Sequence, residues 1–134
     1  MQRKLFALVV GVACLSLTAF AADDKKVPSI KEIMKKGHQG TKSLLSGIKA
    51  EVKGEKWDEA STNAKLLKDF GEALGQNKPA KGDEDSWKKL SEKYKTNTAA
   101  VADAVEKKDA KATADALGVI GKSCGECHMA HKGK

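Results

Sequence analysis

The chain has 134 residues, a length suited to one domain, with a formal net charge of +7 and 32% charged residues. Its lysines are interleaved with Asp and Glu in every segment, as on a solvated helix surface, and there is no basic stripe with interleaved aromatics. This pattern argues against nucleic-acid binding. It leaves an excess of lysine that suits docking to an acidic partner.

Residues 1–21 have the organisation of a secretory signal peptide. A basic start with Arg3 and Lys4 precedes an uncharged apolar run from Leu5 to Phe20, and Ala19-Phe20-Ala21 provides a cleavage site. The run is too short for a comfortable transmembrane helix, and no second hydrophobic stretch follows it. We therefore predict an exported, periplasmic protein with a mature domain at residues 22–134 and no membrane span after cleavage. An uncleaved anchor, or a lipoprotein formed through Cys14, is a weaker alternative.

The mature chain has a helical pattern throughout, without a run of alternating polarity long enough for a strand. The first predicted helix begins at Pro28 with a Ser-x-x-Glu capping box. Its apolar stripe keeps its phase across Gly37 and Gly40 as far as Val52, so we expect one long helix.

Three further helices are predicted. The second runs from about Lys56 to Leu74, the third starts within residues 83–86, and the fourth runs from about Asp109 to the end. Four amphipathic helices with short connections predict an all-α, antiparallel up-down-up-down four-helix bundle. The inward stripes are rich in Ala and Gly, and a bound cofactor would supply the missing apolar bulk.

The last predicted helix carries the sequence Cys-Gly-Glu-Cys-His at residues 124–128, on its inward stripe. Cys124 and Cys127 lie on one side of a helical turn, where their thiols can form thioethers with the two vinyl groups of one porphyrin. The imidazole of His128 is then placed to ligate the iron. We predict one covalently bound haem c enclosed by the bundle.

Two other interpretations of these residues are weaker. A disulfide between Cys124 and Cys127 would close a very small loop and stabilise little. A zinc site with His128 and His131 would crowd four ligands onto two turns of one helix, whereas structural zinc sites draw ligands from separated segments.

The residues from Trp87 onward, above all Lys107-Lys108-Asp109-Ala110 and residues 119–128, resemble the cytochrome c′ (class II c-type cytochrome) family. The resemblance implies thioethers at Cys124 and Cys127, His128 as the proximal iron ligand, and a first helix that covers the distal haem face. Met34 matches the methionine that ligates the iron in low-spin members. The family often has an arginine four residues earlier, where this chain has Ile30.

Three further residues are expected to lie near the haem. His38 lies one turn beyond Met34 and is the alternative distal ligand, or else a solvated or propionate-contacting side chain. Lys132 falls where the family often has a basic residue, and His131 where many members have an aromatic. We expect His131 to pack or hydrogen bond near the haem edge.

The predicted function is that of a monohaem carrier of single electrons between periplasmic redox proteins, with His128 and Met34 on the iron. We expect no enzymatic activity, since neither a Ser/His/Asp nor a paired-carboxylate arrangement stands out. The alternative is a five-coordinate binder of nitric oxide or carbon monoxide with a vacant distal site. The resemblance leaves a homodimer open, because many relatives pair through their first two helices.

Overall fold

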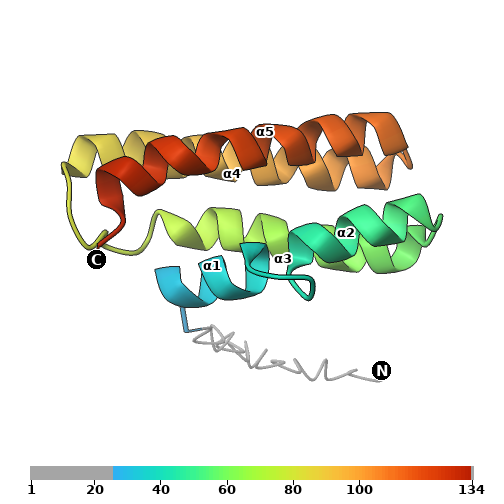
Figure 1. Cartoon of the computed structure of the whole chain (residues 1–134), viewed down its shortest axis with the longest axis horizontal. Coiled ribbons are helices and arrows are strands. Elements are labelled where there is room, and N and C mark those ends of the chain that lie inside the picture. The colour runs from blue at the N-terminus through green and yellow to red at the C-terminus, as the bar shows by residue number, and fades with distance from the viewer. Residues whose placement is uncertain (1–25, 134) are drawn as a thin grey trace, which may run out of the picture.

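The computed structural model describes residues 26–133, so the predicted signal peptide and Cys14 lie outside the described residues. Five helices follow one another: α1 Ile30–His38, α2 Leu44–Lys53, α3 Trp57–Leu74, α4 Glu84–Glu106 and α5 Ala110–His131. In Figure 1, α1 and α2 lie end to end and form the first leg of the bundle, and α3, α4 and α5 form the other three. Each leg runs antiparallel to the one before it, which confirms the all-α, up-down-up-down four-helix bundle.

The one long first helix of the sequence prediction is wrong, because the chain leaves the helix between His38 and Leu44. Gly40 has a φ of +79°, which a right-handed helix does not allow. The hydroxyl of Ser43 then donates to the Gly40 carbonyl at 2.8 Å and accepts from the backbone N–H of Ser46, so it caps a new helix. The first leg is therefore two short helices with a bend between them.

The predicted helix starts agree with the structure to within two residues, and side-chain caps explain three of them. Ser29 and Glu32 form a complete capping box at α1. The Asp83 carboxylate accepts from a backbone N–H in the first turn of α4, and Asp109 does the same at α5. No helix among the described residues has the length and apolarity needed to cross a bilayer.

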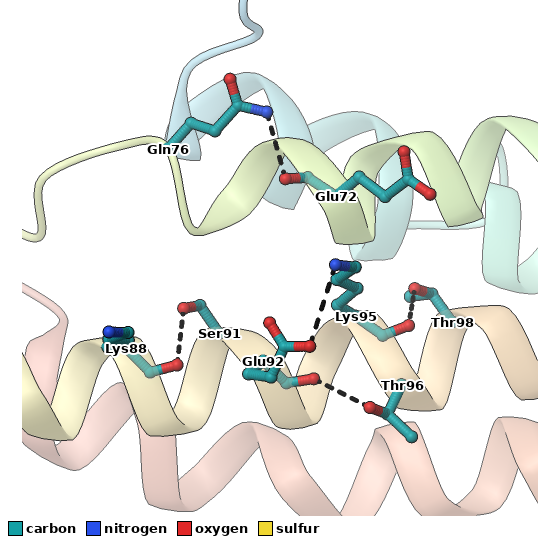
Figure 2. A network of polar contacts seen from close by, with 8 residues as sticks. All are labelled: Glu72, Gln76, Lys88, Ser91, Glu92, Lys95, Thr96 and Thr98. Carbon is teal, nitrogen blue, oxygen red and sulfur yellow. Dashed lines mark hydrogen bonds and ion pairs between the residues drawn. The ribbon is translucent and has the colours of Figure 1, made fainter.

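The contact between α3 and α4 is close because small residues meet there. Ser91 and Thr98 are buried on α4, and each hydroxyl donates to a backbone carbonyl three residues earlier, at 3.1 and 2.9 Å (Figure 2). Opposite them, α3 presents Gly71 and Gly75: a Cβ on Gly71 would overlap the Thr98 hydroxyl, and one on Gly75 would lie 3.1 Å from Ser91 Oγ. These contacts bring α3 and α4 close together without unsatisfied hydroxyl groups at Ser91 and Thr98.

The two halves of the first leg meet the bundle differently. Helix α2 packs directly on α3 and α5, and its Ile48 is fully buried. Helix α1 packs on α3, with Ile33 fully buried, but a cavity lies between it and the C-terminal part of α5. The candidate functional site lies in and around this cavity.

Candidate functional site

Cys124, Cys127 and His128 lie in the last two turns of α5. Both thiols are free and half-buried, and the imidazole of His128 is exposed. The Cys124 S–H donates to the Ile120 carbonyl at 3.3 Å, an ordinary contact along a helix. All three residues therefore belong to one rigid helical segment, as the spacing predicts.

The cavity beside these residues has a volume of about 610 Å³ and is continuous in its lining with a second one of about 60 Å³. Met34, Leu74, Cys127 and His128 line both. The larger volume falls within the roughly 300–1,000 Å³ typical of cofactor sites, and the walls are mostly apolar. Two thiols, one imidazole and an apolar cavity of this size fit a covalently bound haem.

Met34 is half-buried on α1 and lines both cavities, as His128 does from α5. A methionine on an inward stripe is most often ordinary core packing. Here the side chain instead borders the space beside the proximal histidine, so the structure brings together the two residues that the sequence singled out for the iron.

His38 lines only the smaller cavity and is hydrogen bonded within the protein. Its Nε2 lies 2.6 Å from the Tyr94 hydroxyl, and the two rings meet edge to face with centroids 5.5 Å apart. Its Nδ1 is buried and has no partner among the described residues. His38 is thus partly buried and paired with a tyrosine rather than fully solvated, and its contact with a haem propionate stays a prediction.

Tyr94 has a polar role at the site that the sequence alone did not reveal. The ring is buried on α4, and its hydroxyl reaches the only described side chain that bonds it, His38, which is 56 residues away in the sequence. No local sequence signal reports such a pair. Burial raises the pKa of Tyr94, and the nearby Cys124 sulfur raises it further, so the phenol remains protonated and can donate.

The pKa values of two side chains at the site, His38 and Cys127, are shifted toward their neutral forms. Burial lowers the pKa of His38 below 6.5, and the nearby His128 lowers it further. Burial also raises the pKa of the Cys127 thiol, helped by Cys124 and Glu126. Neutral imidazole and neutral thiols are the forms that suit an apolar cofactor site.

His131 lies one turn beyond His128 and has partners on both ring nitrogens. Nδ1–H donates to the Lys81 carbonyl at 3.0 Å, and Nε2 lies 3.0 Å from the Ser86 hydroxyl. The ring is only 4% exposed and meets Trp87 edge to face, with centroids 5.3 Å apart. His131 therefore ties the end of α5 to the start of α4 and to the α3–α4 loop.

These contacts also bear on the zinc alternative. The ring nitrogens of His131 are both occupied, which removes the fourth zinc ligand that the sequence offered. Across residues 26–133, no three His, Cys, Asp or Glu side chains are grouped so as to hold a metal ion by themselves. The donor set at the cavity is two thiols and an imidazole from one helix.

Comparison with known proteins gives one match. Residues 82–132 match the family model of cytochrome c′. No curated protein and no solved structure matches the chain. The matched segment contains α4, α5, Cys124, Cys127 and His128, whereas Met34 lies outside it. The family carries haem c as its cofactor, and the helical bundle with a C-terminal Cys-x-x-Cys-His agrees with it. Over residues 82–132 the chain is therefore similar to cytochrome c′.

Proposed function

We propose that this protein is an exported monohaem cytochrome that carries single electrons between periplasmic redox proteins, with His128 and Met34 as the axial iron ligands. The observation that carries the proposal is the shared cavity lining. Met34 from α1 and His128 from α5 both line the same two neighbouring cavities, and so does Cys127. A thioether and an imidazole on separate helices can hold one iron between them.

The chain's own residues would hold the haem through α5. Each of Cys124 and Cys127 adds across one vinyl group: the sulfur bonds one vinyl carbon and the thiol hydrogen passes to the other, so no oxidant is needed. His128 would then lie beside the macrocycle as the proximal ligand. Bound haem supplies a one-electron iron couple, and the apolar walls of the cavity restrict the access of water to it.

Met34 is a better candidate than His38 for the distal position. The Nε2 of His38 is engaged with Tyr94 at 2.6 Å, and this bond would have to break before that nitrogen reached an iron. The Met34 sulfur has no such competing partner among the described residues and borders both cavities. Methionine ligation favours ferrous iron and raises the reduction potential relative to histidine alone.

A matched pair of methionine variants tests this assignment. Met34→Ala is expected to open the ferrous iron to carbon monoxide, so that the Soret band shifts on adding the gas. Met129→Ala is the control, because Met129 is 79% exposed on α5 and lines neither cavity. The wild type and Met129→Ala should not respond. Carbon monoxide binding by the wild type would support the five-coordinate gas-binding alternative instead.

A further inference from the structure

Four lysines surround the larger cavity where it opens to the surface. Lys31 and Lys35 come from α1, Lys78 from the α3–α4 loop and Lys132 from the end of α5. All four side chains are exposed, although they come from three separate parts of the chain. We call these four residues the lysine rim.

No ion pair joins a rim lysine to an Asp or Glu in the described part of the chain, although the exposed Glu32 lies between Lys31 and Lys35 in the sequence. Neither cavity is lined by any Asp or Glu. The ion pairs of residues 26–133 join other lysines to their acids: Lys93 to Glu126, Lys95 to Glu92 and Lys111 to Asp115. Elsewhere in the sequence lysines are interleaved with Asp and Glu, whereas the lining of the larger cavity contains four lysines and no acidic residue.

A haem in the cavity would not neutralise this charge. Its two propionates carry two negative charges, while the rim carries four ammonium groups. The mouth of the cavity therefore keeps a positive excess even if both propionates pair with lysines. A partner that reached a haem bound in the larger cavity through this mouth would approach past the four exposed lysines.

We propose that the lysine rim is the docking surface for a redox protein that presents an acidic patch around its own electron-transfer site. The proposal rests on the proposed electron-carrier function. Complementary charge steers such encounters and raises the association rate more than it raises affinity. Electron exchange would then take place across the rim.

Two double variants distinguish an effect of the charge at the lysine rim from an effect of the net charge of the protein. Lys31→Glu/Lys35→Glu reverses two rim lysines one helical turn apart. Lys49→Glu/Lys53→Glu reverses two exposed lysines with the same spacing on α2, which line neither cavity. Both variants change the net charge equally, so a difference between them reports position alone.

Stopped-flow reduction of the ferric protein by reduced flavodoxin, an acidic one-electron donor, provides the kinetic assay. At an ionic strength of about 0.01 M, where the Debye length is roughly 30 Å, the rim variant should react about tenfold more slowly than wild type. The α2 variant should stay within about twofold of wild type. The difference should vanish near 1 M salt, where the screening length is roughly 3 Å. Equal slowing of both variants would overturn the proposal.

A binding measurement provides a readout that does not depend on electron transfer. Titration of the ¹⁵N-labelled protein with oxidised flavodoxin should move the amide resonances of α1, residues 78–82 and Lys132, and should leave those of α2 in place. Shifts centred on α2, or spread evenly over the surface, would refute the rim as the docking surface.

The spectra distinguish failure of this proposal from failure of the proposed function. The rim variant should keep the wild-type ferric spectrum and reduction potential. If the potential changes while the salt dependence stays that of the wild type, the lysines serve the propionates and the docking surface is refuted. A high-spin wild-type spectrum would instead refute methionine ligation, without bearing on the flavodoxin results.

Discussion

His131 is predicted to hold the haem-bearing end of α5 against the rest of the bundle. The substitution His131→Phe keeps an aromatic ring in contact with Trp87 but removes the bonds to the Lys81 carbonyl and the Ser86 hydroxyl, each 3.0 Å long. A hydrogen bond contributes about 0.5–1.5 kcal/mol net, so the loss of two should lower the free energy of unfolding by about 1–3 kcal/mol. His131→Ala also leaves a cavity, and we expect it to cost roughly 3–5 kcal/mol by analogy with other buried rings.

Urea unfolding of the holoprotein, followed by tryptophan fluorescence, measures these differences. With a slope of about 1–3 kcal/mol per molar urea, His131→Phe should lower the midpoint by around 1 M. Ser86→Ala removes only one of the two bonds and serves as the control, with about half the effect. A midpoint for His131→Phe within error of the wild type would show that the two hydrogen bonds do not hold α5, and would refute this reasoning.

Three other predictions concern packing, pH and haem attachment. Gly71→Ala would overlap α4 and should destabilise by about 1–3 kcal/mol, whereas Gly118→Ala meets nothing within 4 Å and should stabilise by up to about 1 kcal/mol in thermal unfolding. The pKa of His38 is lowered from 6.5, so the unfolded chain binds more protons below that pH. Stability should therefore be constant above pH 6.5 and fall below it, and His38→Gln should reduce the fall in urea midpoints measured across this range. Replacing both Cys124 and Cys127 with serine should release the haem on a denaturing gel, where the wild type keeps its colour; retention by the double variant would contradict attachment at these thiols.

Most of the fold could be predicted from the sequence because it depends on local signals. For example, Trp87, Leu90, Tyr94 and Val101 follow one another at helical spacing in the sequence, and all four are buried on α4. Capping residues and hydrophobic period act within a few positions along the chain, so a single sequence contains them.

The bend in the first leg was missed although its signals were present. The stripe keeps its phase across the bend, and this continuity outweighed Gly40 and the capping hydroxyl of Ser43. Thr41 has the sequence spacing of an inward position, but it is exposed because the backbone there is not helical. Hydrophobic phase alone does not show whether the backbone between two turns is helical.

Some features of the candidate site could likewise be predicted from the sequence, and others could not. The positions of Cys124, Cys127 and His128 on one turn follow from helix geometry alone. The pairing of His38 with Tyr94 joins residues on separate legs, and only the packing of α1 near α4 decides it. The same holds for the lysine rim, whose members come from three parts of the chain.

The central claim is that Met34 and His128 both ligate the iron of an electron carrier, and the absorption spectrum of the purified ferric holoprotein tests it most directly. We predict a low-spin spectrum with a methionine–iron charge-transfer band in the near infrared, and the loss of that band in Met34→Ala. A high-spin ferric spectrum without the band would contradict the claim.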